Sequence, residues 1–112
     1  VLYLFADERL GGTSFYRPLQ PMAQIEALIE DSARMDAAEF AARHGWTPGY
    51  PGASNACFER VLTVPPRFNR AIFYDGSLFH CSDIPEPARL SADPRRGRLT
   101  LNGFWVCRRA AR

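Results

Sequence analysis

The first seventeen residues show the alternation of apolar runs and polar turns that is typical of strands. Residues 1–5 are apolar or aromatic and predict a buried strand. A polar turn that contains Gly11 and Gly12 follows, and residues 13–17 predict a second strand. Together the two strands predict a β-hairpin with a long loop.

The middle of the chain changes to helical spacing. Ile25, Leu28 and Ile29 recur at the spacing of one helix face and predict a helix of about three turns. Asp36 and the glutamate three residues later predict a capping box that opens a second, short helix, which ends at the following glycine. The two helices form a predicted insert over about residues 22–45.

The second half of the chain returns to strands separated by loops. Glycine, proline and polar residues predict loops over residues 47–56 and 82–97. Because strands occupy both ends and helices only the middle, the pattern favours a single, mainly β domain over residues 1–112, an antiparallel sandwich or barrel with a helical insert. The remaining predicted strands are residues 58–64, 69–74, 77–80 and 98–107, of which the last is the longest.

Composition and charge exclude several classes of protein. The chain has 112 residues, of which 46% are apolar, so one modest core is expected and disorder is not. Its fourteen basic residues are all arginines, but twelve carboxylates balance them, so no nucleic-acid or membrane partner is predicted. The three cysteines include no C-x-x-C pair, which argues against a disulfide framework or a zinc site and predicts a cytoplasmic protein.

Arg98 and His80 are the first candidates for chemistry. In an extended strand Arg98, Thr100 and Asn102 share one face, which either meets solvent or points into a barrel mouth, where the guanidinium would bind a carboxylate through two hydrogen bonds. His80 ends an apolar run and is either a hydrogen-bonded packing residue or a metal ligand. Cys81 points to the opposite face from His80, so the two are a poor nucleophile–base pair.

The order of several short segments resembles the C-terminal part of the Fe(II)/2-oxoglutarate dioxygenases, in particular the prolyl-hydroxylase-like members. Those enzymes have a double-stranded β-helix, or jelly-roll, fold, so the resemblance implies a jelly roll that is truncated at its N-terminus. The sequence is most similar to an uncharacterised bacterial group, a domain of unknown function, that has Pro-Pro-Arg-Phe-Asn-Arg before the histidine strand. The segments are residues 2–4, 11–15, 65–74, 78–80 and 97–102.

The resemblance implies a role for individual residues. His80 matches the distal iron-binding histidine, and Arg98 matches the residue that binds the distal carboxylate of 2-oxoglutarate. Tyr3 matches a position that contacts the cosubstrate in some members, and the alternative is that Tyr3 is a core aromatic. Thr100 and Asn102 are expected to line the same pocket. Neutral imidazole suits ferrous iron, and the planar guanidinium suits a dicarboxylate. Fe(II) and 2-oxoglutarate are therefore the implied cofactors, and the substrate is a small molecule or a peptide.

Two features depart from the family pattern. Seventeen residues separate His80 from Arg98, so this loop must bulge outward if the two side chains are to reach one cavity. The H-x-D or H-x-E pair that completes the iron site is absent and is expected upstream of Val1 or lost, so the chain should not be catalytic by itself. The alternatives are a non-catalytic jelly-roll module that binds a partner or ligand, and a cupin-like isomerase or sugar-binding domain.

Overall fold

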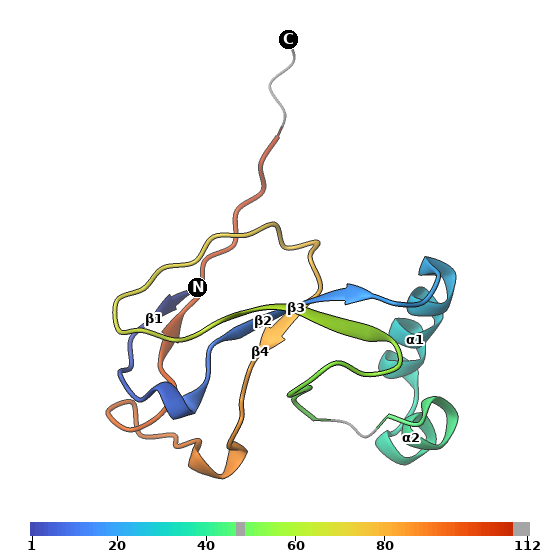
Figure 1. Cartoon of the computed structure of the whole chain (residues 1–112), viewed down its shortest axis with the longest axis horizontal. Coiled ribbons are helices and arrows are strands. Elements are labelled where there is room, and N and C mark those ends of the chain that lie inside the picture. The colour runs from blue at the N-terminus through green and yellow to red at the C-terminus, as the bar shows by residue number, and fades with distance from the viewer. Residues whose placement is uncertain (47–48, 109–112) are drawn as a thin grey trace.

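The computed structural model describes residues 1–46 and 49–108, which form two small antiparallel sheets and a pair of helices (Figure 1). One sheet has the strand order β3-β2-β4, and the other pairs β1 with β5. The strands are β1 (Leu2–Tyr3), β2 (Thr13–Pro18), β3 (Phe58–Val64), β4 (His80–Ser82) and β5 (Thr100–Leu101), and the helices are α1 (Met22–Arg34) and α2 (Ala37–His44), with short 3-10 turns η1 (Glu8–Leu10) and η2 (Pro87–Arg89).

The three-stranded sheet is built on β2, which pairs with β3 on one side and with β4 on the other. Ser14 lies opposite both Thr63 and Cys81, and Phe15 lies opposite His80. The register shifts between Phe15 and the next residue, where β3 has one extra residue, Val61, that has no partner in β2. The predicted strands over residues 13–17 and 58–64 are confirmed.

The two helices cover one end of this sheet, at the opposite end of the molecule from β1 (Figure 1). Asp36 caps α2 by accepting hydrogen bonds from the backbone N–H groups of Ala38 and Glu39, both at 2.9 Å, so the predicted capping box is confirmed. The helix ends at Gly45, whose φ of 65° is the left-handed conformation that favours glycine. The buried residues of the resulting core are Tyr16, Ile25, Leu28, Phe40 and Phe58.

The two-stranded sheet has a separate and smaller core. Leu2 pairs with Leu101 and Tyr3 pairs with Thr100. The buried residues beneath it are Tyr3, Phe5 and Leu10. The predicted hairpin between residues 1–5 and 13–17 is therefore wrong, because β1 pairs with the end of the chain while β2 enters the other sheet.

Three other strand predictions were also wrong in extent. The strand predicted over residues 98–107 is only the two residues of β5, and residues 69–74 contribute a single bridge between Ala71 and Leu2. The segment predicted over residues 77–80 becomes a strand only at His80. A segment with strand-forming side chains becomes a strand only where a neighbouring segment pairs with its backbone N–H and C=O groups. In the described residues no strand pairs with positions 102–107.

The architecture is a mixture of small antiparallel sheets and helices. The described residues form no closed barrel, so the jelly roll stays a prediction. The longest helix, α1, has 13 residues and a length of about 20 Å. Within residues 1–46 and 49–108, no helix has both the length and the apolar character needed to cross a membrane.

Candidate functional site

A cavity of about 650 Å³ lies between β4, β5 and the segment that precedes β4. Arg98, Thr100 and Asn102 line it, whereas the alternate residues Leu99 and Leu101 do not. The polar face predicted from the alternation therefore points into a cavity. His80 lines the same cavity, so the structure brings together the imidazole and the guanidinium that the sequence predicts to converge. Thr13 and Ser82 add two hydroxyl groups to this wall.

Arg98 is half-buried and is held by backbone rather than by acids. Its Nε donates to the carbonyl of Gly11 at 3.0 Å, and its Nη2 donates to the carbonyl of Gly12 at 2.7 Å. The guanidinium also lies about 6 Å from the rings of Tyr3 and Phe5 (6.0 and 5.7 Å). Among the described residues no carboxylate lies within ion-pair distance of Arg98. Burial lowers the pKa of Arg98, but an arginine stays charged at neutral pH.

Gly12 brings the two ends of the long loop together. Its carbonyl accepts a hydrogen bond from the backbone N–H of Asp83, at the start of the loop, and from Arg98, at its end. A side chain at this position would place its Cβ 1.9 Å from the carbonyl oxygen of Val64, so only glycine fits. This closure is how the seventeen-residue excursion returns Arg98 to the cavity that His80 lines.

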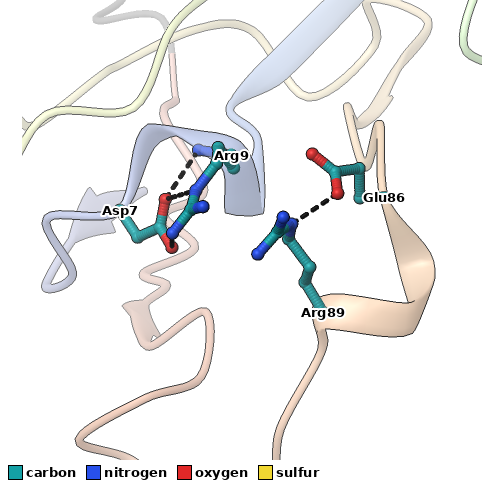
Figure 2. A network of polar contacts seen from close by, with 4 residues as sticks. All are labelled: Asp7, Arg9, Glu86 and Arg89. Carbon is teal, nitrogen blue, oxygen red and sulfur yellow. Dashed lines mark hydrogen bonds and ion pairs between the residues drawn. The ribbon is translucent and has the colours of Figure 1, made fainter.

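The turn η1, beyond β1, and the turn η2, within the long loop, lie side by side, and each has an ion pair of its own (Figure 2). Arg9 of η1 binds Asp7 with Nε at 2.8 Å and Nη2 at 2.8 Å, and Arg89 of η2 binds Glu86. The hydrogen bond from Arg9 lowers the pKa of Asp7 to about 2, and the charge of Arg89 adds to this effect. The two pairs are exposed and contribute little to stability.

His80 begins β4 with its side chain exposed at the cavity. Its Nδ1 lies 2.6 Å from the carbonyl oxygen of Leu78, and because a carbonyl only accepts, Nδ1 donates the proton. The neutral ring then has an unprotonated Nε2, which is the atom that binds a metal or accepts a hydrogen bond. The ring of Tyr74 packs against the imidazole edge to face at 4.7 Å.

The described residues do not fit an iron ion by themselves. They contain no group of three or more histidine, cysteine or acidic side chains placed to hold a metal. Asp83, three residues after His80, instead has its carboxylate 3.9 Å from Arg60. His80 is therefore a single nitrogen donor among the described residues.

Tyr3 does not line the cavity. It is fully buried, and its hydroxyl lies 2.7 Å from the Oγ1 of Thr13, which does line the cavity. Tyr3 is thus one layer behind the wall, in the position of a core aromatic. Its predicted contact with a cosubstrate, like the ligand roles of Arg98, Thr100 and Asn102, stays a prediction.

Sequence reasoning missed three parts of the site. The carbonyls of Gly11 and Gly12 carry no side-chain signal, although two adjacent glycines before a strand are a sign of close backbone approach. Thr13 was assigned only to a strand. An aromatic group from two segments, Phe73 and Tyr74 with Phe104 and Trp105, also lines the cavity.

A second, smaller cavity of about 250 Å³ lies at the end of the β3-β2-β4 sheet that the helices cover. Tyr16, Phe58 and Phe79 line it together with Cys81. Tyr16 donates to the carbonyl of Pro51 at 2.6 Å, and burial raises the pKa of its hydroxyl to about 12. Burial likewise raises the pKa of Cys81, which makes this thiol a poor nucleophile.

Comparisons with known proteins give one match. The model of a family described as a family of unknown function (DUF6445) matches residues 1–105, which include Gly11, Gly12, His80 and Arg98. No curated protein and no solved structure matches the chain.

Proposed function

Because the chain belongs to the DUF6445 family, whose function is unknown, we propose its function from the cavity. The chain is the cosubstrate-binding part of a jelly-roll domain of the Fe(II)/2-oxoglutarate dioxygenase type, and Arg98 binds a carboxylate of 2-oxoglutarate. The observation that carries the proposal is a half-buried guanidinium that faces a cavity shared with His80 and has no acidic partner among the described residues.

The hydrogen bonds of Arg98 explain why it suits a carboxylate. The two backbone carbonyls occupy Nε and one N–H of Nη2, which leaves Nη1 and the second N–H of Nη2 without a partner in the described part of the chain. A buried charge is costly unless it is paired. The two terminal nitrogens form the edge that donates hydrogen bonds to both oxygens of a carboxylate, and the two backbone carbonyls hold the plane of this edge in place.

The rest of the cavity wall supports a doubly charged ligand. None of the described lining residues is acidic, so nothing in the wall repels an anion. The hydroxyls of Ser82 and Thr100 can donate to further ligand oxygens. A dicarboxylate fits this combination of one fixed cation and several neutral donors.

The described residues supply only one ligand of the proposed iron site. His80 would supply one nitrogen, and the remaining ligands are not found among the described residues. The proposed roles are therefore cosubstrate binding for Arg98 and a single metal contact for His80. We place the protein in the reducing cytoplasm, which the three free cysteines support.

The same observation favours a second candidate. A chain that binds a dicarboxylate without holding iron is a non-catalytic jelly-roll module that binds a small ligand. The two candidates share the Arg98 site and differ in chemistry. Because the described residues do not complete an iron site, the assay uses the full-length protein with Fe(II) and 2-oxoglutarate. Succinate formation that is lost in His80→Ala supports the oxygenase, and its absence supports the binding module.

Calorimetric titration with 2-oxoglutarate tests the shared site. Arg98→Lys keeps the charge but loses the planar edge, so we expect its affinity to fall at least tenfold, and Arg98→Gln should abolish binding. The matched control is Arg95→Lys, an exposed arginine of the same loop that does not line the cavity. The proposal fails if the wild-type chain does not bind 2-oxoglutarate, or if Arg98→Lys binds it as tightly as Arg95→Lys does.

A further inference from the structure

The cavity has a second wall that the carboxylate site does not use. Four aromatic side chains form it, and we call this group the aromatic wall: Phe73, Tyr74, Phe104 and Trp105. Phe73 and Trp105 are in contact, with ring centroids 6.2 Å apart. Both are nevertheless largely exposed, at 81% and 73% of their surfaces. Exposed aromatic rings that line a cavity are characteristic of a binding surface rather than of a core.

The aromatic wall lies away from Arg98 along the chain that connects them. Arg98 is anchored at Gly11 and Gly12, whereas Trp105 is seven residues further on, after β5 has ended. Figure 1 shows the segment after β5 running away from the sheets. The described rings that lie against the Arg98 guanidinium are Tyr3 and Phe5, which are not part of the aromatic wall, so the wall is left for a second group when a small dicarboxylate binds at Arg98.

Gly103 helps to hold the indole of Trp105 in place. A Cβ at Gly103 would lie 2.5 Å from the ring of Trp105, so the absence of a side chain there lets the indole fold back over the backbone. With Gly103 on one side and Phe73 on the other, the ring is positioned before any ligand arrives. A preformed aromatic surface binds a flat ring with a smaller entropic cost than a flexible one.

We infer that the aromatic wall binds the aromatic ring of an uncharged substrate group while 2-oxoglutarate occupies Arg98. Aromatic rings prefer edge-to-face or offset contacts, which the tilted pair of Phe73 and Trp105 offers. A basic group is not favoured, because the described lining residues include the Arg98 cation and no acid. The inference rests on the proposed function, since it names the substrate class for the same cavity.

The test uses N-acetyl-L-phenylalaninamide as the probe and the indole N–H signal of Trp105 as the reporter. The chain is labelled with ¹⁵N and saturated with 2-oxoglutarate, and the signal is assigned by its loss in Trp105→Phe. We expect the probe to shift the Trp105 signal and to bind at least fivefold more tightly than the aliphatic N-acetyl-L-leucinamide. Phe73→Ala should weaken binding at least tenfold, and the exposed Phe68→Ala, which lies outside the cavity, should leave it unchanged.

The outcomes separate this inference from the proposed function. If 2-oxoglutarate binds but the Trp105 signal does not move, or moves equally with the aliphatic probe, the inference is wrong and the carboxylate site stands. If the aromatic probe binds but 2-oxoglutarate does not, the proposed function is wrong. Because Phe73 and Phe68 are both exposed, neither substitution should unfold the chain.

Discussion

The three-stranded sheet, which the helices cover, and the two-stranded β1–β5 sheet are stabilised in different ways. The β3-β2-β4 sheet packs its apolar side chains against α1 and α2 around five buried residues. The β1–β5 sheet buries only Tyr3, Phe5 and Leu10, while residues that follow β5, such as Phe104, stay exposed over 93% of their surface. In this second region the segments are joined mainly by hydrogen bonds from the Arg98 guanidinium to the Gly11 and Gly12 carbonyls, and by close backbone packing at these glycines.

This difference separates stability from binding. Apolar burial is the largest source of stability, so the helix-covered region should dominate the free energy of unfolding. A region with little burial and several exposed rings opens more easily, which is typical of sites that admit a ligand. The positions of β4 and β5 connect the two regions, because His80 belongs to the first sheet and Arg98 leads into the second.

The largest expected effect comes from removing a ring of the helix-side core. Phe58→Ala should lower the free energy of unfolding by about 3–5 kcal/mol, because Phe58 is buried between β2 and the helices. Phe104→Ala, in the other region, should change it by less than about 0.5 kcal/mol. Denaturation in urea measures both, and an equal loss for the two variants would contradict the division.

A smaller effect is expected at the glycine that closes the long loop. Gly12→Ala forces a Cβ against the Val64 carbonyl and should cost about 1–3 kcal/mol. It should also weaken 2-oxoglutarate binding, because the Gly12 carbonyl positions Arg98. Gly52→Ala is the control, since nothing lies within 4 Å of its added Cβ. Unchanged stability and affinity in Gly12→Ala would show that the closure does not matter.

The smallest effect concerns Tyr16 and alkaline pH. Its pKa of about 12 in the fold, raised mainly by burial from 10.0, means that the folded state favours the neutral phenol. The corresponding stability is complete below pH 10 and is lost as the pH rises from 10 to 12. Tyr16→Phe should remove this part of the alkaline loss and, at neutral pH, cost about 0.5–1.5 kcal/mol for the lost hydrogen bond to Pro51. Urea denaturation at several pH values measures this, and a wild-type profile that is no steeper than the variant's would be the contrary result.

Local signals predicted the elements that depend on neighbouring residues. The capping box of Asp36 and Glu39 and the glycine after α2 marked the short helix correctly, because their hydrogen bonds are made within a few residues. The alternation also placed Arg98 and Thr100 on the cavity side and Leu99 and Leu101 on the other, but it fails after β5, where Gly103 and Trp105 line the cavity as well.

Features that depend on distant partners could not be predicted in the same way. Residues 102–107 have strand-forming side chains, but a strand needs a pairing neighbour, and this cannot be derived from the segment itself. The pairing of β1 with β5 joins residues from opposite ends of the chain. Local patterns cannot indicate such a pairing, and they favour a hairpin with the next strand instead. The apolar run around Tyr3 predicted that it is buried, but not that its hydroxyl pairs with Thr13, because that partner lies in the other sheet.

The most direct test of the account is a crystal structure of the chain with 2-oxoglutarate. We expect one carboxylate of the ligand to accept hydrogen bonds from the terminal nitrogens of Arg98, with the Gly11 and Gly12 carbonyls still bound on the other side and the His80 ring facing the same cavity. A ligand bound elsewhere, or an Arg98 side chain paired with a carboxylate of the protein, would contradict it.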